Sequence, residues 1–263
     1  MKKHSYKQID SDKNKFSYLE FGSRNKKTIL CLHGYSDTAE IYIPLEDLLS
    51  DEYHIIALDF PMSHDNNHVY SLNSLTDYVL EFIDRMNLKH LDLFGFSMGG
   101  LIGINVAHKS NRVAKLFIVN IVPNLLQGSL LPHIYKVIYP LIKTRWFCKL
   151  ISLIKTNPYL ANKLGTMKDE ETIFRMKNNY YSIFSTMFSI IKTNELEIFN
   201  KLSNDKIIFI FKDDEVLKYE DYKEQINSLK CSKYFFDNGG HRSKEDYWDC
   251  LVPILKQHYL NFK

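Results

Sequence analysis

The sequence lacks the features that mark secreted, membrane-spanning and metal-stabilised proteins. Its four cysteines lie far apart and form no Cys-x-x-Cys pair, so we expect free thiols rather than disulfides or a zinc site. The N-terminus is basic, but no apolar run follows it, and we therefore expect no secretory signal. Lys136, Lys143 and Arg145 interrupt the most hydrophobic region, residues 130–155, which argues against a membrane span. These absences favour a cytoplasmic protein.

The sequence also has little net charge and no nucleotide-binding motif. A net charge of +3 is too small to indicate a nucleic-acid partner. Neither a Gly-rich phosphate loop nor a dinucleotide fingerprint is present, and we expect no cofactor. His64 and His68 lie four residues apart, but such a metal-binding pair needs a helix, and Pro61 with two asparagines indicates a loop. We therefore expect no bound metal.

What the sequence does contain is an alternation of strand and helix patterns. Continuous apolar runs, each typical of a strand buried on both faces, occupy residues 28–34, 53–61, 90–95 and 113–120. Apolar residues recur at helical intervals from 75 to 86, and Ser74 and Asp77 have the spacing of a capping box. A strand at 206–211, a helix, a short strand and a closing helix at 243–259 complete the pattern. The alternation predicts an α/β fold with a mostly parallel central sheet flanked by helices.

One long segment interrupts this alternation. Residues 124–203 are helical in pattern, aromatic and lysine-rich, and they are far too numerous for an ordinary connection. We therefore predict a helical cap at 124–203, inserted into a core domain formed by residues 1–123 and 204–263. Between Pro123 and Leu202 the chain has eleven basic and five acidic residues, so the predicted cap is the basic part of the protein.

The segment Gly95–Gly100 reads G-F-S-M-G-G and follows a predicted buried strand. Between a strand and a helix, the serine of G-x-S-x-G stands on a strained turn, and the flanking glycines let the two elements approach closely. Such a serine lies at the carboxyl edge of the sheet, above a helix N-terminus that favours a developing anion. We predict that Ser97 is a nucleophile. The competing interpretation is a bend that only packs the strand against the helix.

A nucleophilic serine needs a base, and the base needs an acid that orients it. The histidines that follow Ser97 are His108, His133, His241 and His258. The predicted base is His241, because it lies in a Gly-Gly loop just after the last predicted strand, at the same sheet edge as Ser97. Three acidic residues after the strand at 206–211 qualify by position as the orienting acid: Asp213, Asp214 and Glu215.

Five segments in this order resemble the α/β-hydrolase superfamily over nearly the whole chain. They are LHGY (32–35), DFP (59–61), GFSMGG (95–100), FKDDEV (211–216) and GGH (239–241). The resemblance implies an α/β-hydrolase fold with a catalytic triad of Ser97, His241 and Asp214. Asp214 is preferred because Phe211 then aligns with the glycine of the family's G-x-x-D turn. Asp213 remains the alternative acid.

The resemblance also implies which groups bind the substrate oxygen. The oxyanion hole would be formed by the backbone N–H groups of Tyr35, after the His-Gly pair, and of Met98, after the nucleophile. Relatives usually carry glycine after D-x-P, where this chain has Met62. Since that loop borders the site in relatives, we expect Met62 to affect how the substrate fits and not the catalytic roles.

These features predict a capped serine hydrolase that resembles esterases and lipases and cleaves carboxylic esters through an acyl-enzyme. The aromatic cap favours an apolar acyl group, and its positive charge favours something anionic nearby. A methyl ester on a chain carried by acyl carrier protein is one substrate that fits both. The same triad would also allow thioester cleavage, C–C bond hydrolysis or lyase chemistry. The alternative from another class is a catalytically silent ligand-binding protein that retains the fold.

Overall fold

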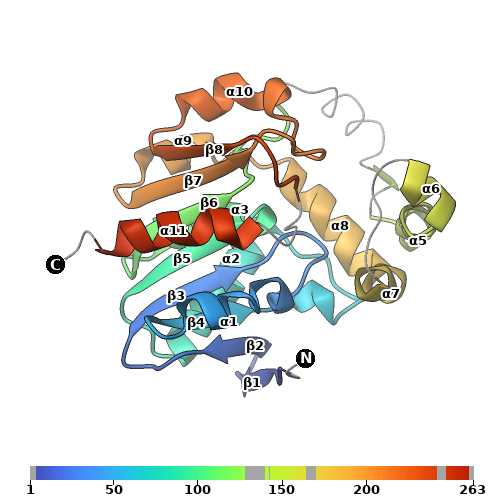
Figure 1. The fold of residues 1–263 in the computed structure, drawn as a ribbon. Helices are drawn as coiled ribbons and strands as arrows, with labels where there is room; N and C mark the ends of the chain where they lie inside the picture. Colours follow the sequence, from blue (N-terminus) through green and yellow to red (C-terminus); the bar gives the residue numbers. More distant parts are fainter. Residues whose placement is uncertain (1–3, 128–139, 142, 164–169, 242–246, 261–263) are drawn as a thin grey trace.

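The computed structural model describes residues 4–127, 140, 141, 143–163, 170–241 and 247–260 (Figure 1). His133 and part of the predicted cap therefore lie outside the described residues. One eight-stranded sheet has the order β1-β2-β4-β3-β5-β6-β7-β8. Strands β3 to β8 pair in parallel, whereas β1 and β2 pair antiparallel with their neighbours. The strands are β1 (Lys7–Asp10), β2 (Lys15–Phe21), β3 (Lys27–Leu32), β4 (Tyr53–Leu58), β5 (Leu91–Phe96), β6 (Val113–Val119), β7 (Asp205–Phe211) and β8 (Ser232–Phe236).

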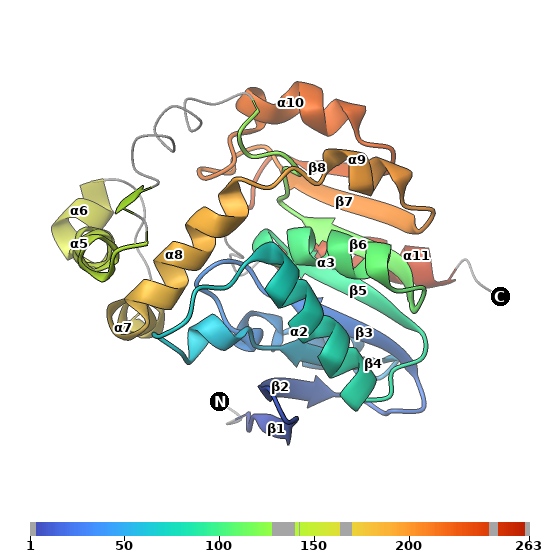
Figure 2. The same cartoon turned by 180° about the vertical axis from the view of Figure 1, so that it is seen from behind.

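Helices cover both faces of this sheet. Helices α1 and α11 lie over one face (Figure 1), and α2 and α3 lie over the other (Figure 2). Alternate side chains of β7 divide between the two resulting cores: Ile208 and Ile210 pack on the α2–α3 side, and Phe209 and Phe211 on the α11 side. The sheet-covering helices are α1 (Leu45–Leu49), α2 (Leu72–Arg85), α3 (Met98–Lys109), α10 (Tyr219–Ser228) and α11 (Tyr247–Leu260), and two short 3₁₀ helices are η1 (Ala39–Tyr42) and η2 (Pro61–Ser63).

Between β6 and β7 the described chain forms helices and no further strand of the sheet. We call α5 to α9 the inserted helices. Figure 1 shows α5, α6 and α7 standing beyond the edge of the sheet, with α8 between them and the core. None of the described helices is both long and apolar enough to cross a membrane. The inserted helices are α5 (Arg145–Lys155), α6 (Pro158–Lys163), α7 (Glu170–Asn178), α8 (Tyr180–Ile191) and α9 (Leu196–Lys201).

Side chains and backbone groups of the loop after η2 tie the inserted helices to the core. Asn66 accepts a hydrogen bond from the N–H of Tyr181 at the start of α8 (2.7 Å), and Tyr70 N–H donates to the hydroxyl of Thr186 (3.0 Å). The guanidinium of Arg145 at the start of α5 donates to the carbonyl of Asn66 and stacks on the ring of Tyr181. These contacts fix α5 and α8 relative to the sheet edge.

The predicted parallel strands and the mostly parallel sheet are confirmed, but two local predictions are wrong or incomplete. The capping box of α2 is formed by Ser71 and Ser74, not by Ser74 and Asp77. The helix starts one turn earlier because Leu72 packs into the core, and Asp77 instead pairs with a lysine of α3. Strands β1 and β2 were not predicted, since β1 is short, polar and mostly exposed.

Candidate active site

Ser97 joins β5 to α3 in a strained backbone conformation. Its φ and ψ are 50° and −115°, at the N-cap of α3. A residue with a Cβ in such a conformation costs about 1–3 kcal/mol and persists only where its surroundings impose it. Here the N–H of Ser97 donates to the carbonyl of Val119 on β6 (2.9 Å), and its own carbonyl accepts the N–H of Gly100 (2.9 Å). The turn is therefore held from both sides.

The two glycines of the motif allow the close packing that this turn requires. A Cβ on Gly99 would lie 2.0 Å from the carbonyl oxygen of Leu32, and one on Gly95 would lie 2.6 Å from the Cα of Gly100. Both distances are far below van der Waals contact, so neither position admits a side chain without displacement of the backbone. The contact at Gly99 also places the end of β3, and the loop that follows it, against the first turn of α3.

The half-buried His241 and the buried Asp214 form a hydrogen-bonded pair. The Nδ1 atom of His241 lies 2.7 Å from Oδ2 of Asp214. The other carboxylate oxygen, Oδ1, accepts the N–H groups of Val216 (2.8 Å) and Leu217 (2.6 Å). Because an ionised carboxylate only accepts hydrogen bonds, the imidazole donates from Nδ1 and presents Nε2 as its proton-accepting nitrogen.

The two neighbouring acids bind the backbone of the histidine loop rather than the imidazole. The carboxylate of Asp213 accepts the N–H groups of Gly239 (3.1 Å) and Gly240 (2.7 Å). The carboxylate of Glu215 accepts the N–H of His241 (3.0 Å). The three acids that the sequence leaves as alternatives thus have different partners, and Asp214 is the one that contacts the ring.

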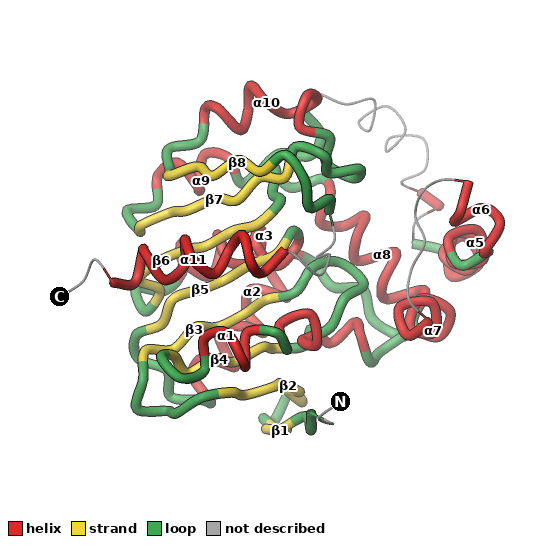
Figure 3. Tube along the Cα trace, viewed as in Figure 1, coloured by secondary structure: helices red, strands yellow, loops and turns green. Residues whose placement is uncertain are grey.

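The imidazole lies beside the strand that carries Ser97. The ring of His241 and that of Phe96, the residue before Ser97, have centroids 5.4 Å apart. Among the described residues, no hydrogen bond joins the Ser97 hydroxyl to the imidazole. Such contacts are often long in enzymes without substrate and tighten when the substrate binds. The structure therefore brings Asp214 and His241 into contact and places Ser97 at the same sheet edge. Figure 3 shows the loops that follow the parallel strands gathered there, near α8.

Asn120 is a site residue that the sequence did not single out. It directly follows β6 and has a φ of 49°, a left-handed conformation that asparagine tolerates better than most residues. Its side chain donates to the carbonyl of Gly240 (2.8 Å) and accepts the N–H of Phe211 (3.1 Å). Asn120 therefore ties the end of β7 to the loop that carries His241. A polar residue directly after a buried strand was the available signal.

His33 orients the loop that contains Tyr35. Phe60 N–H donates to Nε2 of His33 (3.0 Å), so the proton of this neutral ring resides on Nδ1, which donates to the carbonyl of Gly34 (2.8 Å). Burial lowers the pKa of His33 and favours this neutral form. In a trans peptide the carbonyl and the following N–H point in opposite directions. The N–H of Tyr35 consequently points away from His33.

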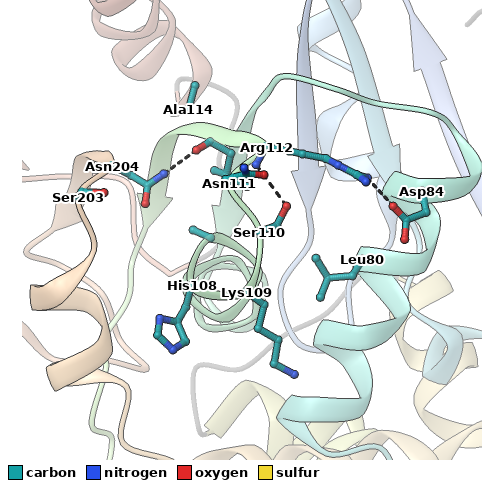
Figure 4. A pocket seen from close by; sticks show the side chains of 12 residues that line it. Leu80, Asp84, His108, Lys109, Ser110, Asn111, Arg112, Ala114, Ser203 and Asn204 are labelled. Carbon is teal, nitrogen blue, oxygen red and sulfur yellow. Dashed lines mark hydrogen bonds and ion pairs between the residues drawn. The ribbon is translucent and has the colours of Figure 1, made fainter.

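The site lies apart from an open pocket of about 900 Å³, drawn in Figure 4. This pocket is lined by the end of α3 and the start of β6, where Arg112 pairs with Asp84 and Asn204 donates to the carbonyl of Val113. It lies at the amino-terminal ends of the parallel strands. None of the predicted site residues lines it.

Comparisons with known proteins place this geometry in context. The model of the alpha/beta hydrolase fold family matches residues 27–246. The uncharacterized hydrolase YugF of Bacillus subtilis is 22% identical over 269 residues, which cover 93% of each chain. The crystal structure of haloalkane dehalogenase DbeA from Bradyrhizobium elkani is similar with a TM-score of 0.76 at 15% identity, and 98% of each chain is covered. The enol-lactonase from Burkholderia xenovorans has a TM-score of 0.74 at 13% identity over 97% of this chain and 100% of its own.

Proposed function

This chain belongs to the α/β-hydrolase superfamily, and we propose that it is a serine hydrolase that cleaves carboxylic esters through Ser97, His241 and Asp214. The observation that carries the proposal is the hydrogen bond of 2.7 Å between His241 and Asp214, at the sheet edge where Ser97 is strained. A chain that only binds a ligand has no physical need for this combination.

In the proposed reaction, Nε2 of His241 takes the proton of the Ser97 hydroxyl while Oγ attacks the ester carbonyl. The tetrahedral intermediate collapses, and the imidazolium returns the proton to the departing alkoxide. Water, activated by the same nitrogen, then attacks the acyl-enzyme and releases the acid. Asp214 stabilises the imidazolium at both stages through its bond to Nδ1.

The negative oxygen of the intermediate would be bound by two backbone N–H groups. Met98 is the first residue of α3, so its N–H has no partner in the preceding turn of the helix. The Tyr35 N–H, directed away from His33, is the second donor. Each such donor typically lowers the barrier by about 2.7–4 kcal/mol. In this role His33 is a positioning residue, because it acts on the oxyanion only through the Gly34 peptide.

Acyl transfer suits a serine nucleophile better than the displacement chemistry named for DbeA. Displacement of a halide by Ser97 would leave an alkyl ether, which water and a general base do not cleave. Acylation instead leaves an ester, which the His241–water pair can hydrolyse in the second half of the cycle. Covalent catalysis through Ser97 therefore favours an acyl substrate over a haloalkane.

The surroundings of Tyr35 favour an apolar acyl group. Its ring lies 6.2 Å, between centroids, from that of Phe184 on α8, within a cluster that includes Met176 and Cys148. We propose that residues 124–203 form a cap whose apolar inner side contacts the acyl chain. An ester linked to acyl carrier protein stays a prediction from the basic residues of this cap.

A substrate series tests the proposal. Hydrolysis would be measured for the wild type and for Ser97→Ala. The substrates are p-nitrophenyl esters of increasing chain length, matched thioesters and a carrier-linked methyl ester. We expect hydrolysis of the esters, an acyl adduct on Ser97 by mass spectrometry, and a loss of turnover of at least about 10⁴ in Ser97→Ala. Near-normal turnover in Ser97→Ala would overturn the mechanism. Hydrolysis of thioesters alone would retain the triad but reassign the substrate.

A further inference from the structure

Helix α5 has a buried face and an opposite face of exposed apolar side chains. Cys148 and Ser152 are buried against the other inserted helices. Trp146, Leu150 and Leu153 are 60%, 45% and 56% exposed. Residues four and three apart lie on one side of a helix, so these three side chains form a continuous stripe directed away from the protein.

Two further apolar side chains of α5 and α6 are exposed. Ile154 of α5 is 41% exposed, and Tyr159 of the adjacent α6 is 74% exposed. We call Trp146, Leu150, Leu153, Ile154 and Tyr159 the outer patch. Exposed apolar residues that are contiguous mark interaction surfaces more often than scattered ones do. Over the sheet domain, the large exposed apolar side chains that the structure describes are single ones: Val69, Val216 and Phe235.

The charged residues of α5 and α6 themselves are all basic. No Asp or Glu occurs anywhere between Asp92 and Asp169. Lys149 on α5 is exposed and pairs with no acid among the residues that the structure describes. Lys149 lies three residues after Trp146 and four before Leu153, so its ammonium group borders the apolar stripe. An apolar centre with a cationic margin is complementary to an interface of hydrocarbon and anionic headgroups.

The position and length of α5 suit a helix that lies on a membrane surface. Figures 1 and 2 both show α5 and α6 at the periphery, with α8 between them and the sheet. At 11 residues, α5 is roughly 16 Å long, about half the thickness of the hydrocarbon core. Tryptophan and tyrosine are the aromatic residues that favour the headgroup region. A second copy of the chain is disfavoured as the occupant, because it would bring two cationic margins together.

We propose that the outer patch docks this protein onto an anionic lipid surface. Trp146, Leu150 and Leu153 enter the headgroup region, and the ammonium group of Lys149 contacts a lipid phosphate. The carboxyl edge of the sheet, with Ser97 and His241, then lies on the same side of the molecule as the membrane (Figure 1). The docking does not depend on the proposed hydrolysis, since the patch shares no residue with that site.

The two tryptophans of the chain provide a direct test. Trp248 is 5% exposed, whereas Trp146 is the most exposed member of the stripe. Vesicles of equimolar phosphatidylglycerol and phosphatidylcholine should shift the emission of Trp146 to shorter wavelength and protect it from acrylamide. Vesicles of phosphatidylcholine alone should give a much weaker effect. The variant Trp146→Phe, which keeps Trp248, should show no shift.

Sedimentation with the same vesicles separates the apolar and the charged contributions. Leu150→Ser/Leu153→Ser should lower the partition coefficient by about tenfold or more, and Lys149→Glu should lower it by about fivefold or more, since each surface lysine contributes a factor of about five. Phe235→Ser and Lys89→Glu change exposed residues of the sheet domain and should bind as the wild type does. Only the lysine contribution should weaken with added salt.

An unchanged Trp146 emission with anionic vesicles would overturn the proposal, as would wild-type sedimentation of the Leu150→Ser/Leu153→Ser variant. Concentration-dependent dimers that this variant abolishes, without vesicle binding, would assign the patch to a second copy instead. A salt-sensitive complex with an acidic carrier protein, again without vesicle binding, would assign it to a protein partner. The emission test uses the unmodified chain, so misfolding of a variant cannot explain a negative result.

Discussion

The carboxyl edge of the sheet and the outer patch of α5 and α6 differ in whether their side chains are held by partners. At the sheet edge, the acidic side chains have partners that fix their positions: Asp213 and Glu215 hold the loop backbone, and Asp214 holds the imidazole. On the outer patch, apolar side chains and lysines face solvent. The first arrangement suits catalysis, which needs side chains in fixed positions. The second suits binding to a fluid lipid surface, which does not need fixed positions.

The largest effects are expected when the two adjacent aspartates, Asp213 and Asp214, are each replaced by asparagine in separate variants. Asp214→Asn should lower kcat/KM by about 10³–10⁴, because an amide at this position disfavours the Nδ1–H tautomer and no longer stabilises the imidazolium. Asp213→Asn retains an acceptor for the Gly240 N–H and should cost about tenfold at most. Ester hydrolysis by the two variants provides the measurement. If Asp213→Asn had the larger effect, Asp213 would be the triad acid.

Asn120 tests whether loop placement, rather than the triad alone, sets the rate. Removing its contacts to Gly240 and Phe211 in Asn120→Ala should lower kcat by about 10–100-fold with little change in KM, since a small displacement of a catalytic group is costly. Asn120→Gly relieves the positive φ but lacks the same hydrogen bonds. Equal losses in both variants would assign the effect to the hydrogen bonds. Recovery in the glycine variant would assign it to backbone strain instead.

His33 gives the sheet edge a pH dependence that the outer patch does not have. Its folded pKa is lowered by burial, so below the ordinary value of 6.5 the unfolded chain binds a proton that the folded chain excludes. The free energy of unfolding should therefore fall as the pH falls below 6.5, by at most about 1.4 kcal/mol per pH unit from this residue. Urea denaturation of the wild type and His33→Gln between pH 8 and pH 5 measures the difference. Parallel curves for the two proteins would contradict this role.

The smallest expected effect is that of the outer patch on catalysis in water. Leu150→Ser/Leu153→Ser should change kcat/KM for a water-soluble short-chain ester by less than about twofold, because the side chains are exposed and make few contacts. Asp214→Asn should in turn leave vesicle binding unchanged. Together these two results would show that the regions act independently. A loss of short-ester turnover in the leucine variant would show that the outer patch also holds the active site in place.

The contrast also explains which parts could be predicted from the sequence. Buried parallel strands such as β3 and β7 are continuous apolar runs, and such runs can be recognised as strands without knowledge of the neighbouring strands. Ser97 and His241 stand out because a strand, a turn and glycines surround them in sequence. Strand β1 was missed because its residues, KQID, have no apolar run and are stabilised by pairing with β2.

Roles that depend on contacts between distant parts of the chain could not be predicted from the sequence. Position alone left Asp213, Asp214 and Glu215 equivalent, and only their partners in the histidine loop distinguish them. Asn120 acts across 120 positions of the chain on Gly240. The apolar residues of α5 gather on one side of the helix, a pattern that ordinarily indicates a buried face, so the sequence could not indicate that Trp146, Leu150 and Leu153 would be exposed.

The measurement that tests the proposed mechanism most directly is covalent labelling with a fluorophosphonate, followed by mass spectrometry of the modified peptide. We expect one adduct per chain, located on Ser97, formed by the wild type and lost in His241→Ala, because the reagent reacts only with a serine that a base activates. The Leu150→Ser/Leu153→Ser variant serves as the control and should label at the wild-type rate. A folded wild-type protein that forms no adduct, or one that labels equally in His241→Ala, would contradict the proposal that Ser97 is an activated nucleophile.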